Sequence, residues 1–105
     1  MNFDREYDYF NDFADNNGLY ARFSMYGEDI KFDEELPLRE RTDRKMIYQV
    51  ADKGIDIAVP IVGRTWGDFY IAANTAIMVS DDLDHCYVED FRILEGGDIE
   101  LITGS

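Results

Sequence analysis

Apolar residues follow two different periods along this chain, and the first period predicts a helix at the N-terminus. Over residues 3–14 the apolar positions recur at spacings of four, three and four: Phe3, Tyr7, Phe10 and Ala14. Tyr9 and Phe13 widen this stripe. The spacing is typical of an amphipathic helix, and Gly18 follows it as a residue at which helices commonly end.

After this helix, apolar and polar residues mostly alternate, which is the pattern of half-buried β-strands. Apolar and polar residues alternate over 19–26, and a turn follows at 27–29. Residues 30–32 would form the returning strand, so we expect a first hairpin here. Residues 33–45 contain Pro37 and few apolar side chains. They predict a long loop in which basic residues concentrate.

Two more hairpins follow from the same alternation. The first pairs Met46–Val50 with Ile55–Val62, and Pro60 marks the second of these strands as an edge strand or a bulged one. The second pairs Phe69–Ala73 with Ala76–Val79 around a two-residue turn.

The C-terminal third contains one ambiguous stretch. Residues 81–95 fit a short helix stopped by Gly96 and Gly97, and they also fit a strand. We favour a short acidic turn at 81–84 followed by a strand, which pairs with a last strand at 99–102. The chain is therefore expected to form one compact α+β domain over residues 1–105. An N-terminal amphipathic helix would pack on an antiparallel, hairpin-rich sheet of about five to seven strands. A second short helix at 81–95 is kept as an alternative to the turn and strand.

Composition supports a folded protein. Of the 105 residues, 46% are hydrophobic and 14% aromatic, whereas acidic disordered segments are poor in aromatic residues. A single cysteine, Cys86, excludes an intrachain disulfide and agrees with a reducing compartment. The first ten residues are acidic and aromatic, unlike a secretory signal, and no apolar run reaches the roughly 18 residues of a membrane span. We expect a soluble cytoplasmic protein.

Charge adds the most informative feature. The chain has 23 acidic and 10 basic residues, a formal net charge of −13, whereas a small soluble domain typically carries a net charge of magnitude about 2–8. The charge is also divided into blocks: residues 1–35 sum to −7, residues 36–66 to +2 and residues 67–105 to −8. Excess like charge destabilises a compact state. Its segregation therefore indicates a face that is presented to a basic partner or to a cation.

Four aspartates form the most regular part of this face. Asp4, Asp8 and Asp12 follow one another at a spacing of four, and Asp15 lies one turn on, away from the aromatic stripe. Like charges at this spacing repel by roughly 0.2–0.5 kcal/mol per pair. Further acids cluster in two later stretches, and together they make up the candidate partner-binding residues: Asp4, Asp8, Asp12, Asp15, Glu28, Asp29, Asp33, Glu34, Glu35, Asp81, Asp82 and Asp84.

Catalytic and ligand-binding motifs are missing from the sequence. His85 and Cys86 are the only residues of their types, and neighbours on a strand point to opposite faces, so we expect no catalytic pair. Asp81–Asp84 lacks the spacing and glycine of a calcium loop. We expect no catalytic residue, metal or cofactor. We also expect no direct binding of nucleic acid, because its phosphates would repel the negative net charge of the protein. Binding to a membrane is not expected either.

These features predict an inhibitor that occupies the basic nucleic-acid site of a nuclease or of a CRISPR or restriction effector. In size and composition the chain is similar to the small acidic anti-restriction and anti-CRISPR proteins of phages, several of which mimic DNA. That resemblance implies a partner in the host cytoplasm. An immunity protein or antitoxin against a basic toxin is the alternative, and a phage structural or assembly protein is a second. Under each of these three functions, the sequence leaves open whether the protein forms a homodimer.

Overall fold

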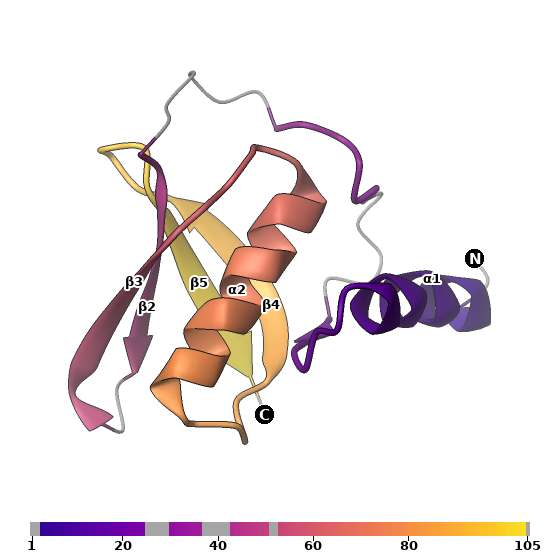
Figure 1. Cartoon of the computed structure of the whole chain (residues 1–105), viewed down its shortest axis with the longest axis horizontal. Coiled ribbons are helices and arrows are strands. Elements are labelled where there is room, and N and C mark those ends of the chain that lie inside the picture. Colours follow the sequence, from indigo (N-terminus) through magenta and orange to yellow (C-terminus); the bar gives the residue numbers. More distant parts are fainter. Residues whose placement is uncertain (1–2, 25–29, 37–42, 51–52, 105) are drawn as a thin grey trace.

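The computed structural model describes residues 3–24, 30–36, 43–50 and 53–104, and for residues 3–8 it describes the backbone alone. These residues form two helices and a five-stranded mixed sheet, an α+β fold (Figure 1). The elements in chain order are α1 (Phe3–Asn16), β1 (Arg22–Phe23), β2 (Lys45–Val50), β3 (Ile55–Pro60), α2 (Trp66–Ser80), β4 (Tyr87–Ile93) and β5 (Ile99–Gly104).

The helix α1 confirms the prediction from apolar spacing. Phe10 and Ala14 are buried, Phe13 is half-buried, and Asp12 and Asp15 on the other side are exposed. The helix ends where the backbone amide of Asn17 donates to the carbonyl of Phe13, and Gly18 follows in the left-handed region at φ 65°. Glycine adopts this conformation without the steric cost that a side chain carries.

The helix α2 was not predicted, and residues 69–79 are not a hairpin. Thr65 caps its start: the Thr65 hydroxyl accepts from the amide of Asp68, and the Asp68 carboxylate accepts from the amide of Thr65, both at 3.1 Å. This is a capping box, which satisfies two amides that lack intrahelical partners. Its exposed side also carries apolar residues, Ile71, Met78 and Val79, so the sequence shows no single apolar stripe. The short helix left open at 81–95 is also wrong, because that stretch is a turn followed by β4.

The sheet has the strand order β1-β4-β5-β2-β3. Its outer hairpins are antiparallel, as predicted for β2 with β3 and for β4 with β5. The pairs β1 with β4 and β2 with β5 are parallel, which overturns the prediction of an all-antiparallel sheet. In the described part, Arg22 and Phe23 are the whole of β1 and residues 30–32 are not a strand, so the first predicted hairpin is wrong there; its turn at 27–29 lies outside the described residues.

The core has two parts. Between α2 and the sheet lie alternating residues of β2, β3 and β5 and the buried residues of α2; Met46 of β2, Ile77 of α2 and Ile99 of β5 have no exposed surface. Beside it, five aromatic rings pack with centroids 4.1–5.6 Å apart: Phe10, Phe13, Phe23, Phe32 and Tyr70. Their contacts place α1 beside α2 at the β1 edge of the sheet (Figure 1). The helix that covers the sheet is therefore α2, whereas the sequence predicted that it would be α1.

Candidate acidic partner-binding surface

The segment 30–36 is fastened to the start of α2 by its backbone. The amide of Gly67 donates to the carbonyl of Phe32 at 2.9 Å, and the amide of Trp66 donates to the carbonyl of Glu34 at 3.1 Å. First-turn amides of a helix have no intrahelical acceptor, so these carbonyls serve as their caps. The contacts fix the position of three exposed carboxylates next to the first turn of α2: Asp33, Glu34 and Glu35.

Helix α1 lies against the same part of α2. The amide of Phe32 donates to the hydroxyl of Tyr9 at 2.9 Å. Gly67 meets Phe13 so closely that a β-carbon at residue 67 would lie 2.8 Å from the ring. Because this docking uses the aromatic side of α1, Asp12 and Asp15 are left exposed.

The chain after α1 continues along α2 toward its C-terminus. The side-chain oxygen of Asn74 accepts from the amides of Tyr20 and Ala21, at 2.7 and 2.9 Å. The hydroxyl of Tyr20 then donates to the carbonyl of Leu83 at 3.2 Å. These bonds connect the segment after α1, inside the first acidic block, to the turn 81–84 in the last one.

The turn at the C-terminus of α2 concentrates negative charge. Asp81 adopts the left-handed conformation at φ 58°, and the carboxylate of Asp82 lies 3.0 Å from Nδ1 of His85. Asp81 and Asp84 are exposed. The carbonyl end of a helix carries a partial negative charge, which carboxylates do not relieve. Lys53 offsets part of this charge by donating to the carbonyl of Ser80 at 2.7 Å.

These contacts place acids of the first block beside the first turn of α2 and acids of the last block at its C-terminal turn. We call this set the acidic border; in the described side chains it consists of Asp12, Asp15, Asp33, Glu34, Glu35, Asp81, Asp82 and Asp84. It follows α2 from its first to its last turn, and 15 residues of helix extend about 22 Å. Duplex DNA carries about 13 phosphates over that length, and one strand six or seven. In number, the eight carboxylates exceed the roughly six or seven phosphates of one strand and fall short of the about 13 of the duplex.

Four of the predicted acids are not placed on this surface by the structure. Asp4 and Asp8 lie in α1 at helical spacing from Asp12, but their side chains are outside the description. Glu28 and Asp29 lie outside the described residues altogether. The acidic border rests on the other eight.

Sequence reasoning missed two exposed tyrosines next to the acids. Tyr9 and Tyr20 are 42% and 44% exposed although each makes a hydrogen bond that fixes its hydroxyl. Tyr9 had been assigned to the apolar stripe of the helix and Tyr20 to the polar face of a strand. Their signal in the sequence is proximity alone: each lies within five residues of Asp12 or Asp15.

Two arginines of the weakly basic middle block, residues 36–66, contact the protein itself. The guanidinium of Arg64 lies 3.7 Å from the carboxylate of Glu35. Arg44, from the loop predicted to be basic, is buried and donates to the carbonyl of Gly97. Arg39 and Arg41 of that loop lie outside the described residues.

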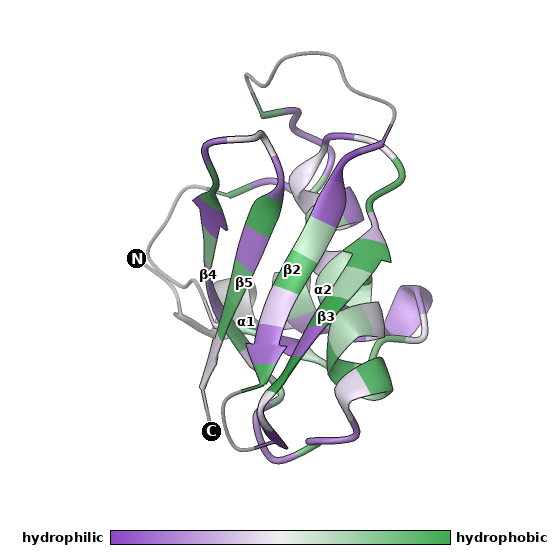
Figure 2. Ribbon diagram, turned by 90° about the vertical axis from the view of Figure 1, so that its left-hand side faces the viewer, coloured by the Kyte–Doolittle hydropathy of each residue, from purple (hydrophilic) through white to green (hydrophobic). Residues whose placement is uncertain are grey.

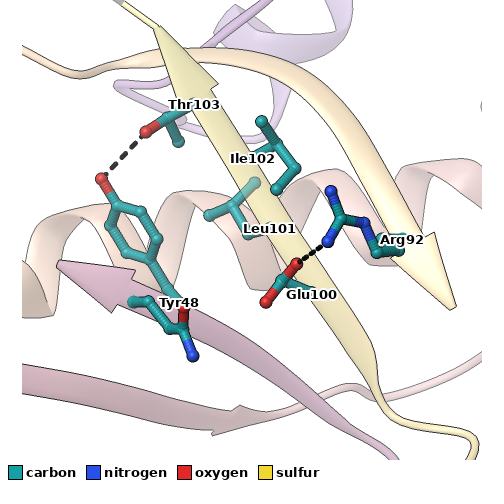
Figure 3. Close-up of a pocket in the computed structure, with 7 residues that line it drawn as sticks. Tyr48, Arg92, Glu100, Leu101, Ile102 and Thr103 are labelled. Atoms are coloured by element: carbon teal, nitrogen blue, oxygen red, sulfur yellow. Dashed lines mark hydrogen bonds and ion pairs between the residues drawn. The ribbon is translucent and has the colours of Figure 1, made fainter. Parts of the chain in front are cut away.

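A separate open pocket of about 370 Å³ lies where β2 and β5 part (Figure 3). Their parallel pairing covers only Met46 with Ile99 and Ile47 with Glu100. Four of the polar side chains that line the pocket pair with each other: Tyr48 with Thr103 at 3.0 Å, and Arg92 with Glu100 at 3.1 Å. A site whose polar groups already have partners is poorly prepared to orient a ligand.

Within the described ranges, no three or more His, Cys, Asp or Glu residues are grouped so that they could hold a metal ion. Neither described helix is long and apolar enough to cross a membrane. The chain matches no protein-family model, no curated protein and no solved structure.

Proposed function

We propose that this protein is an inhibitor that binds the basic nucleic-acid site of a nuclease or of a CRISPR or restriction effector. The acidic border would lie where the phosphates of the nucleic acid normally bind, and the protein would act as a phage anti-defence DNA mimic in the host cytoplasm. It would itself have no enzymatic activity. The observation that supports the proposal is that acids of the first block lie beside the first turn of α2 and acids of the last block at its C-terminal turn.

The cost of this arrangement also supports it. Asp81, Asp82 and Asp84 gather at the helix end where negative charge is least favourable. A surface selected only for solubility would intersperse both signs. A dense negative surface attracts a cationic groove over a long range and raises association rates by roughly 10–10³.

An immunity protein or antitoxin is the second candidate, and one observation favours it. Tyr9 and Tyr20 present exposed rings within five residues of Asp12 or Asp15. Tyrosine is enriched among the residues that dominate binding energy at protein interfaces. A complex built on these rings would keep much of its affinity at high salt, whereas a phosphate mimic would lose affinity.

Affinity capture with competition separates the two candidates. The immobilised protein is incubated with bacterial lysate, and bound proteins are eluted with short duplex DNA at two salt concentrations. The proposal predicts that the eluted proteins bind nucleic acid and are retained less well at the higher salt. Retention that DNA never reverses would contradict mimicry and, if it also survives salt, would favour the immunity protein.

A further inference from the structure

Strand β3 leaves a regular row of backbone hydrogen-bonding groups at the edge of the sheet. The amide of Ile61 donates to the carbonyl of Arg44 at 2.9 Å, which makes this pair a hydrogen-bonded one. Hydrogen-bonded and non-bonded pairs alternate in an antiparallel ladder. In the observed register, Ala58 opposite Ile47 and Asp56 opposite Gln49 are therefore non-bonded pairs. The amides and carbonyls of Asp56 and Ala58 point away from β2.

This edge has little of the protection that edge strands usually carry. Such protection comes from bulges, lysines, prolines or very short strands. The β1 edge is a two-residue strand, and β4 has a register shift between Val88 and Asp90. By contrast, β3 pairs with β2 over six residues without a shift, and Pro60 stands only at its end. Figure 2 shows β3 as the outer strand of the sheet.

We infer that two copies of this protein pair through β3 in an antiparallel, two-fold arrangement that joins their sheets. The outward groups allow a register in which Asp56 of one copy lies opposite Ala58 of the other and the two exchange both hydrogen bonds. Symmetry repeats this pair, so four backbone hydrogen bonds form around a central pair of Ile57 residues. This inference goes beyond the proposed function and does not depend on it.

Side chains in this register are compatible with pairing. Like charges directly opposite each other destabilise a strand pair, and here each Asp56 faces the small Ala58. On the helix-facing side, Ile55 of one copy lies opposite Val59 of the other. Ile55 is 45% exposed in the single chain, and pairing would cover part of it.

The edge itself carries little charge that would oppose a second copy. Within β3 itself the only ionisable residue is Asp56. The acidic turn at 81–84 lies near the residue-53 end of this edge, because Lys53 bonds to Ser80. Antiparallel pairing puts residue 53 of one copy and residue 53 of the other at opposite ends of the paired strands. Six residues of strand extend about 20 Å, so at least this distance separates the two acidic turns along the strands. That separation is more than twice the Debye length of about 8 Å at physiological ionic strength.

The molar mass measured over a concentration series tests the pairing. The interface is small, and interfaces below about 1,200 Å² are typically transient, so the series should reach the millimolar range. We expect the mass to rise from 12.2 kDa toward twice that value. Higher salt should strengthen the pairing, because it screens repulsion between two acidic proteins. A mass that stays at one chain throughout would overturn the inference.

Charge substitutions test the register. The variant Ala58→Glu places two acids opposite each other, and we expect association to weaken about tenfold or more. The double variant Asp56→Lys/Ala58→Glu converts each repulsive pair into an attractive one and should restore association. Ala58→Gln is the matched control: it adds a side chain of similar size at the same position without the charge, and should leave association unchanged. If Ala58→Glu and Ala58→Gln behave alike, or if the double variant fails to recover, pairing through β3 is wrong.

The outcome is distinguishable from that of the proposed function. Ala58 lies outside the acidic border, so Ala58→Glu should still retain the proteins that DNA displaces. Loss of dimer mass with unchanged retention supports the β3 pairing and leaves the proposed function intact.

Discussion

The hydroxyl of Tyr20 donates to the backbone carbonyl of Leu83 across 63 positions of sequence, at 3.2 Å. This bond joins the connection after α1 to the acidic turn after α2. Together with the two bonds that Asn74 accepts, it fastens a segment of the first acidic block to α2 and to the acidic turn of the last block. The acidic border is thus a product of tertiary structure.

A buried tyrosine in the same region should contribute more to stability than Tyr20. The hydroxyl of Tyr70 donates to the carbonyl of Ala21 at 2.6 Å and is buried. Tyr70→Phe leaves that carbonyl without its donor and should lower the free energy of unfolding by about 1–3 kcal/mol. Tyr20→Phe, at an exposed site where water can replace the hydroxyl, should cost about 0.5 kcal/mol. Urea denaturation of both variants measures the difference, and equal costs would contradict it.

The capping box should determine much of the stability of α2. Thr65→Ala removes the oxygen that accepts from Asp68 and should cost about 0.5–2 kcal/mol. Thr75→Ala is the matched control, because Thr75 is exposed in the middle of α2 and alanine is the better helix former there. The control should be neutral or slightly stabilising in thermal unfolding. A silent Thr65→Ala would argue against a helix that starts at residue 66.

Close packing of α1 on α2 requires glycine at residue 67. A β-carbon there would lie 2.8 Å from the Phe13 ring and 2.9 Å from the carbonyl oxygen of Phe32. Gly67→Ala should therefore destabilise the fold by about 1–3 kcal/mol through overpacking. Gly96→Ala meets nothing within 4 Å and should change stability by less than about 1 kcal/mol. Unfolding midpoints of the two variants provide the comparison, and similar midpoints would show that the two helices are not packed this closely.

Asp81 should trade stability for binding. It lies at the carbonyl end of α2 in the left-handed conformation, which asparagine also tolerates. Asp81→Asn removes a charge that opposes the helix dipole and should stabilise the fold by about 0.3–1 kcal/mol. If the turn contacts a basic partner, the same change should weaken retention of the proteins that duplex DNA displaces. A variant that is more stable and binds equally well would exclude Asp81 from the interface.

Several elements were readable from the sequence because their signals are local. The spacing of Phe3, Phe10 and their neighbours predicted α1, and alternation around Gly54 predicted the hairpin of β2 with β3. Helix α2 was missed because apolar residues surround it and Asp81, instead of glycine, stands at its end. The capping box of Thr65 and Asp68 was a local signal that could have revealed it.

The remaining features depend on distant contacts. The pairing of β1 with β4 joins Arg22 to Tyr87 and leaves no mark on the pattern of either strand. The candidate acids could be named from composition and spacing. Their gathering along α2 could not, since it depends on Asn74 and on the hydroxyl of Tyr20.

The most direct test of the acidic border compares two charge-reversed variants in the DNA-competed capture. Asp12→Lys/Asp84→Lys alters both sequence blocks of the border. Asp56→Lys/Glu95→Lys changes the net charge equally at exposed acids outside it. We predict that the border variant retains the DNA-displaced proteins about tenfold or more less well, because reversed charges meet a basic site, while the control retains them as the unaltered protein does. Equal retention by the two variants would contradict the acidic border as the binding surface.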